Sequence, residues 1–134
     1  MCEPYRGTTC LKYLGNDTIF IKANSKQNQD RREGRVALFS SFIRNYVSDK
    51  CRKVLLPSLC YYFFPPCIQN ARTPTPRQIC RDECHAVKND LCKTEMEDIQ
   101  RMNFKMVPSA SDCSSLPGPS SKGHRTCIKI GALG

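Results

Sequence analysis

The chain has 134 residues with a formal net charge of +9, and ten of its residues are cysteines. Its length is that of one domain and is too short for two independent cores of ordinary size. A high, even number of cysteines, none of them adjacent, is typical of disulfides formed outside the cell and argues against a cytosolic protein. No apolar run approaches the roughly 18 residues of a membrane-spanning helix.

The positive charge narrows the class of partner. A basic surface favours polyanions such as nucleic acid, an anionic membrane or a sulfated glycan. Because a disulfide-bonded chain rarely meets nucleic acid, a sulfated glycan such as heparan sulfate is the electrostatic partner that we expect. A solvated basic surface without a dedicated ligand is the alternative.

A chain whose disulfides form outside the cell must be exported, and this has two further consequences. An exported chain carries a signal peptide, so we expect native residues to have preceded Met1. The sequon at Asn16 lies in a polar turn, which makes Asn16 the candidate glycosylation site, with a chance match as the alternative.

In chain order, the first predicted elements lie before residue 48. The apolar segment 18–21 follows a turn-forming stretch and is predicted to be a short β-strand. Residues 24–32 are almost wholly polar and are predicted to form a surface loop that leads into a helix. Apolar residues then recur at steps of three and four, which predicts the first helix over about 31–47.

A second helix is predicted over 50–64, after the capping pair Ser48-Asp49. Pro57 is expected to bend or split this helix, and the two prolines at 65 and 66 cannot continue it. After a polar loop over 69–76, a third helix is predicted from Arg77 to about Thr94.

The last third has a weaker pattern. Met96, Ile99, Met102 and Met106 are compatible with a short fourth helix. Residues 108–122 are rich in Ser, Pro and Gly and are predicted to be a loop, and the alternation over 127–130 predicts a short terminal strand.

Neither catalysis nor metal binding is indicated. His85 and His124 are the only histidines, and neither stands in a recognised nucleophile pattern, so we expect both to face solvent. A secreted phospholipase would have adjacent cysteines before its histidine. Cys80, Cys84 and His85 are close enough for zinc, but tetrahedral thiolate sites belong to reducing compartments. We therefore expect no enzyme activity, no metal and no cofactor in this chain.

The third to eighth cysteines, at 51, 60, 67, 80, 84 and 92, are separated by eight, six, twelve, three and seven residues. This spacing resembles that of a Frizzled-type cysteine-rich domain, and all ten cysteines have a counterpart there. The stretches at 4–7, 56–60, 80–84 and 127–131 most resemble the Ror family of receptor tyrosine kinases. The muscle-specific kinase family is a weaker match.

The resemblance implies a mainly α, disulfide-rich fold with about four helices and a small N-terminal β element. It also implies that residues 1–134 form one domain, which in the full receptor is followed by a kringle domain, a single transmembrane helix and an intracellular tyrosine kinase. The domain would then lie on the extracellular face of the plasma membrane. The implied disulfides are Cys2–Cys67, Cys10–Cys60, Cys51–Cys92, Cys80–Cys127 and Cys84–Cys113.

Resemblance to Frizzled domains further implies a ligand-binding module for a Wnt-type lipid-modified protein or a co-receptor, with a fatty acyl chain between the helices. The predicted helices carry more aromatic residues than the packing of two helices requires. The residues that we assign to a lipid or ligand site are Phe39, Phe42, Ile43, Tyr46, Leu55, Tyr62 and Phe63. Apolar residues at helical spacing are more often core, which is the alternative for all of them.

This chain also departs from the Frizzled pattern. Residues 13–21 replace the usual segment after the second cysteine, and residues 45–50 form a longer approach to Cys51, which would reshape an acyl groove. Two other functions stay open, a structural spacer for the following kringle and a glycan-dependent adhesion module. The basic residues of the glycan-binding alternative are Arg31, Arg32, Arg35, Arg44, Lys50, Arg52 and Lys53.

Overall fold

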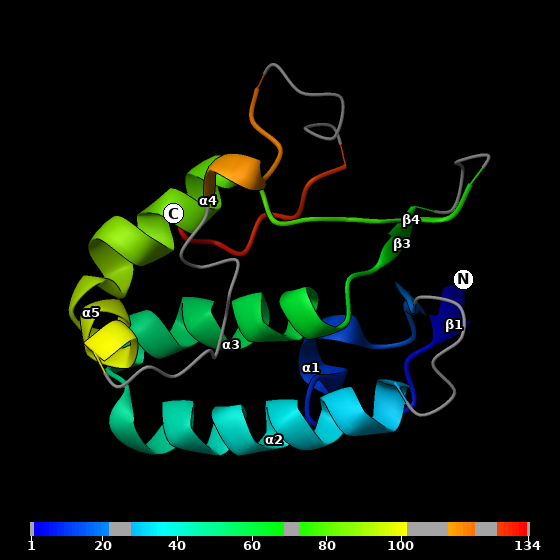
Figure 1. Cartoon of the computed structure of the whole chain (residues 1–134), viewed down its shortest axis with the longest axis horizontal. Helices are drawn as coiled ribbons and strands as arrows, with labels where there is room; N and C mark the ends of the chain where they lie inside the picture. Colours follow the sequence, from blue (N-terminus) through cyan, green and yellow to red (C-terminus); the bar gives the residue numbers. More distant parts are fainter. Residues whose placement is uncertain (1, 22–27, 69–72, 102–112, 120–125, 134) are drawn as a thin grey trace.

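The computed structural model describes residues 2–21, 28–68, 73–101, 113–119 and 126–133 (Figure 1). Two long helices, α2 (Asn28–Tyr46) and α3 (Asp49–Phe63), lie side by side in opposite directions. The N-terminal strands lie at one end of this pair, and helices α4 and α5 gather toward the other end. The fold is therefore mainly helical, as predicted.

The core lies between α2, α3 and the N-terminal segment. Its side chains come from all three, because each contributes apolar residues to one shared face. The largest fully buried ones are Leu14, Ile19, Val36, Ile43, Leu55, Leu59 and Phe64.

The N-terminal β element has two strands, β1 (Cys2–Pro4) and β2 (Thr18–Phe20). They are antiparallel, with Glu3 opposite Ile19. The predicted strand over 18–21 is confirmed through Phe20, whereas β1 is too short to show a pattern in the sequence. The short helix α1 (Leu11–Leu14) between them was not predicted.

Helix α2 begins at Asn28, three residues before the predicted start. The loop predicted before the helix is thus wrong over 28–30, and residues 22–27 lie outside the described part. The reason is tertiary: the side chain of Gln29 is 5% exposed and bonded to the N-terminal segment. The polar composition predicted a loop. The first turn of α2 is polar but helical, because hydrogen bonds to residues distant in the sequence hold it.

Helix α3 begins with Ser48 as its N-cap, as predicted, and ends at Phe63 before the two prolines. Pro57 lies inside the helix and does not split it. The hydroxyl of Ser58 donates to the carbonyl of Val54 at 2.6 Å. Burial of most of the helix supplies the packing that outweighs one missing backbone bond.

A second small sheet follows α3. Its strands are β3 (Cys67–Ile68) and β4 (Thr75–Pro76), paired antiparallel. The sequence indicated only a polar loop here, of which residues 69–72 lie outside the described part.

The predicted third helix over 77–94 is three elements, namely α4 (Arg81–Ala86), the π-helical turn η1 (Val87–Leu91) and α5 (Lys93–Arg101). Residues 77–80 are not helical, because the chain there bonds with a distant segment: Ile79 bridges Ile128. Helical spacing of the cysteines could not reveal that competing partner.

The elements predicted in the last third of the chain are found only in part. The fourth predicted helix corresponds to α5, which contains buried Met96, while Met102 and Met106 lie outside the described part. Within the loop predicted over 108–122, the described residues include a short 3-10 turn, η3 (Cys113–Ser115). The predicted terminal strand is reduced to the bridge at Ile128.

Candidate ligand-binding surface

A covalent frame of five disulfides fixes the surface that the helices present. All ten cysteines are paired. The pairs are those implied by the resemblance, namely Cys2–Cys67, Cys10–Cys60, Cys51–Cys92, Cys80–Cys127 and Cys84–Cys113. Helix α3 lies at the centre of this frame, since it contains Cys51 and Cys60.

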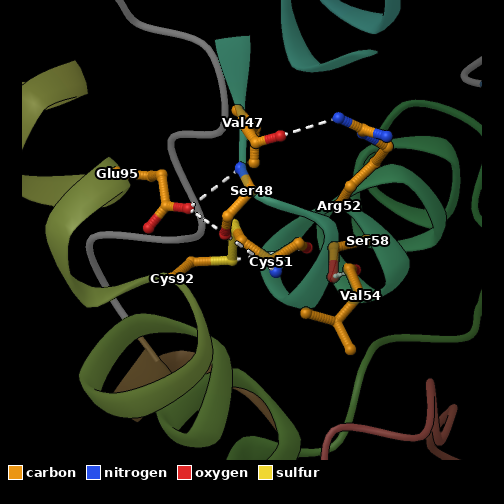
Figure 2. The surroundings of a disulfide bond; sticks show 8 residues. All are labelled: Val47, Ser48, Cys51, Arg52, Val54, Ser58, Cys92 and Glu95. Carbon is orange, nitrogen blue, oxygen red and sulfur yellow. Dashed lines mark hydrogen bonds between the residues drawn. A yellow bond between two sulfur atoms is a disulfide. The ribbon is translucent and has the colours of Figure 1, made fainter. Parts of the chain in front are cut away.

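The turn between α2 and α3 is fixed by a polar cluster around one of these disulfides (Figure 2). The Ser48 hydroxyl donates to the Glu95 carboxylate at 2.6 Å and accepts from the Cys51 N–H at 3.4 Å. The guanidinium of Arg52 donates to the Val47 carbonyl at 2.8 Å. The C-terminal end of α2 is therefore tied to both α3 and α5.

At the other end of α2, the Glu33 carboxylate accepts three hydrogen bonds from the N-terminal segment. The donors are the Tyr5 hydroxyl at 2.7 Å and the N–H groups of Thr8 and Thr9 at 3.1 and 2.9 Å. Burial alone would raise the pKa of Glu33, but these bonds outweigh it and leave the pKa below its usual value. Burial, together with the bond to Glu33, raises the pKa of Tyr5.

Five aromatic residues lie along one flank of α2 and at the end of α3. We call them the aromatic row: Phe39, Phe42, Tyr46, Tyr62 and Phe63. Ring centroids lie 6.3 Å apart for Phe39 and Phe63, 5.2 Å for Phe42 and Tyr46, and 5.2 Å for the edge-on pair Tyr62 and Phe63. Tyr46 is 76% exposed, and Phe39, Phe42 and Tyr62 are half-buried. Phe63 is 6% exposed and belongs to the core, so the structure leaves four of the seven predicted site residues at the surface.

The other two predicted site residues lie elsewhere. Ile43 and Leu55 are 0% and 1% exposed and belong to the core between α2 and α3. Because the two helices pack directly on these side chains, neither residue is part of a surface site. Core and ligand-facing hydrophobes have the same helical spacing, so the sequence could not separate them.

Two further residues of α2 extend the aromatic row. The guanidinium of Arg35 lies over the Phe63 ring, 5.6 Å from its centroid. Leu38 is 69% exposed. At about 100° per residue, both project from the same flank of α2 as Phe42. This flank therefore presents aromatic, aliphatic and cationic groups together.

A hollow of about 190 Å³, partly open to solvent, lies beside Tyr62. Its walls come from three separate segments, the end of α3, the stretch from β4 to α4 and the turn η3. They are Tyr61, Tyr62, Pro65, Pro76, Arg77, Gln78, Ile79, Ser115 and Leu116. Apart from Tyr62, none of these was assigned to a site from the sequence, and no local pattern could have joined residues so far apart in the chain.

The seven basic residues predicted for glycan binding do not share one face. Arg44 follows Arg35 by nine residues, about two and a half helical turns, so the two project from opposite sides of α2. Arg32 is half-buried and donates to the Phe63 carbonyl at 2.7 Å, and burial lowers its pKa.

Two others of the seven face acids. Lys50 lies 3.7 Å from the Asp90 carboxylate and Arg52 lies 2.9 Å from that of Asp49. Lys53 and Arg31 are exposed. Only Arg31 and Arg35 therefore lie on the aromatic flank, which is a small cationic surface for a sulfated chain.

Other sequence predictions concern single positions. Asn16 is exposed in the turn before β2, where a glycan would have room, and its glycosylation stays a prediction. His85 is exposed, and His124 lies outside the described residues. In the described ranges, no three His, Cys, Asp or Glu side chains group as metal ligands. No helix there is long and apolar enough to cross a membrane.

The helical fold and its five disulfides define a module that presents a fixed surface, as extracellular recognition domains do. A family model of the Fz domain matches residues 2–120. The chain therefore belongs to the Fz domain family, the cysteine-rich modules that bind Wnt-type ligands. The family and the five disulfides indicate an extracellular domain.

Proposed function

We propose that this Fz domain is the ligand-recognition module of a Ror-like receptor tyrosine kinase, and that it binds a Wnt-type protein or co-receptor through the aromatic row. The receptor context is supported by the Ror-like stretches at 4–7, 56–60, 80–84 and 127–131. A kringle, a single transmembrane helix and the kinase would follow in the full receptor, so this chain recognises and does not catalyse.

The observation that carries the proposal is the exposure of large side chains on one flank of α2. Tyr46 is 76% and Leu38 69% exposed, and on the same flank the Arg35 guanidinium lies over the Phe63 ring. Aromatic residues and arginine are the groups most enriched in the energetic centres of protein interfaces. The disulfide frame orders much of this surface before binding, which lowers the entropy lost on association.

An acyl chain on such a ligand would not lie between α2 and α3, because Ile43 and Leu55 close that seam. The hollow beside Tyr62 is the place that we propose for it, next to the aromatic row. Each methylene buried there would contribute about 0.8 kcal/mol.

The test is binding of a purified Wnt-type protein, with and without its acyl group, to the immobilised domain by biolayer interferometry. Tyr46→Ala is expected to weaken binding of both forms about tenfold, since an exposed interface tyrosine is lost without disturbing the core. Leu133→Ala is the matched control, because Leu133 is 63% exposed near the C-terminus and outside the aromatic row. Equal affinities for wild type, control and Tyr46→Ala would overturn the proposal.

A further inference from the structure

Helix α2 stands outside the covalent frame. Each other helix of the described chain contains a cysteine or is directly adjacent to one, whereas the cysteines nearest to α2 are Cys10 and Cys51. Figure 1 shows α2 along one edge of the molecule, with α3 between it and α4. The longest helix is thus held by packing and hydrogen bonds alone.

Its N-terminal half is bonded to α3 through Arg32, which donates to the Phe63 carbonyl. It is also held by a group of polar contacts that we call the clasp, made by Gln29 and Glu33. Gln29 donates to the Glu3 carboxylate at 2.7 Å and accepts from the Arg6 N–H at 2.6 Å. Glu33 accepts from Tyr5, Thr8 and Thr9 as described above. Through the clasp, α2 reaches the segment that the disulfides of Cys2 and Cys10 join to the frame.

The C-terminal end is held differently. Ser48 is bonded to Glu95 and caps α3, and Cys51 beside it is bridged to Cys92 (Figure 2). The C-terminal end of α2 therefore stays attached to the disulfide frame even when the hydrogen bonds of the clasp break. A rotation of α2 would therefore pivot at Val47–Ser48.

We propose that α2 is a conformational unit that swings away from α3 about Val47–Ser48 while the disulfide frame stays folded, and that the clasp sets how often it opens. Opening breaks no disulfide. It separates Val36 and Ile43 from Leu55, and it divides the aromatic row, since Phe39, Phe42 and Tyr46 move with α2. Tyr62 and Phe63 stay with the frame, so the ligand surface is assembled only in the closed state.

Native-state hydrogen exchange of the whole chain tests this directly. Once α2 leaves α3 it is an isolated helix of marginal stability, so its own hydrogen bonds open and its amides exchange. Amides over 36–46 are therefore expected to exchange by a partial opening that depends weakly on denaturant, and those over 54–63 by the larger global unfolding. Glu33→Gln, which removes the charge that strengthens the clasp bonds, should speed exchange over 36–46 about tenfold. It should leave the denaturant dependence of amide exchange over 54–63 unchanged. Glu97→Gln is the matched control, an exposed position on α5 outside the clasp.

Equal protection and equal denaturant dependence of the two helices would overturn the proposal, as would unchanged exchange over 36–46 in Glu33→Gln. If that variant does not fold, Gln29→Ala provides the same comparison from the other half of the clasp. The exchange measurement contains no ligand, so its outcome is independent of the function proposed above. The coupling to ligand does rest on that function: a bound Wnt-type protein should slow exchange over 36–46 more than over 54–63.

Discussion

At the scale of single residues, the Glu33 carboxylate joins two parts of the chain that are far apart in sequence. It accepts the Tyr5 hydroxyl and two backbone N–H groups, and Tyr5 in turn accepts the Cys10 N–H at 3.0 Å. A methyl group at Gly7 would overlap both the Glu33 carboxylate and the Tyr5 hydroxyl. These contacts give a physical reason for the tyrosine at 5 and the glycine at 7.

The lowered pKa of Glu33 predicts acid sensitivity. A carboxyl whose pKa is lower in the folded than in the unfolded state stabilises the fold above its unfolded pKa, about 4.3, and loses that contribution as the pH falls further. The free energy of unfolding, measured by urea denaturation, should therefore fall between about pH 5 and pH 3. In Glu33→Gln this fall should be smaller, and an identical pH profile would contradict the assignment.

Gly7→Ala should lower the free energy of unfolding by about 1 to 3 kcal/mol, the range for forcing an atom into a packed site. Gly34→Ala is the matched control, since a methyl group there meets no atom within 4 Å. Thermal denaturation followed by circular dichroism compares the two. A Gly7 variant as stable as the Gly34 variant would show that the N-terminal segment shifts to make room for the methyl group without a loss of stability.

At the scale of elements, the sequence predicts the helices and helix ends that depend on a local pattern of residues. The three- and four-residue spacing around Val36 and Ile43 predicts α2, and Ser48 with Pro65 predicts the two ends of α3. The start of α2 at Asn28 and the loss of helix over 77–80 depend on partners far along the chain. The aromatic row was predicted as part of a larger set, because burial decides which apolar residues remain at the surface.

Ser48→Ala is expected to destabilise the domain by about 1 kcal/mol, because the hydroxyl's bonds to the Cys51 N–H and to Glu95 are both lost. Ser41→Ala is the control, an exposed serine in the middle of α2. Chemical denaturation measures both. Equal stability of the two variants would mean that the disulfide of Cys51 and the remaining hydrogen bonds suffice to fix this turn.

At the scale of the whole molecule, the disulfides join segments that are far apart in the sequence. The bridge between Cys84 and Cys113 spans 29 residues and holds the turn η3 against α4. Replacing both cysteines by alanine should lower the free energy of unfolding by about 3 to 4 kcal/mol on the chain-entropy account. Calorimetry should show a lower melting temperature, and an unchanged one would mean that noncovalent contacts such as the bond from Arg81 to the Leu116 carbonyl suffice.

The whole-molecule claim is that a stapled Fz domain presents one flank of α2 and the end of α3 to its ligand. Titration of the ¹⁵N-labelled domain with a Wnt-type protein, followed by amide chemical shifts and line broadening, tests it most directly. We predict perturbations concentrated at residues 35–46 and 61–64, with α5 unaffected. Perturbations confined to α5 and the C-terminal residues, or none at saturating ligand, would contradict the account.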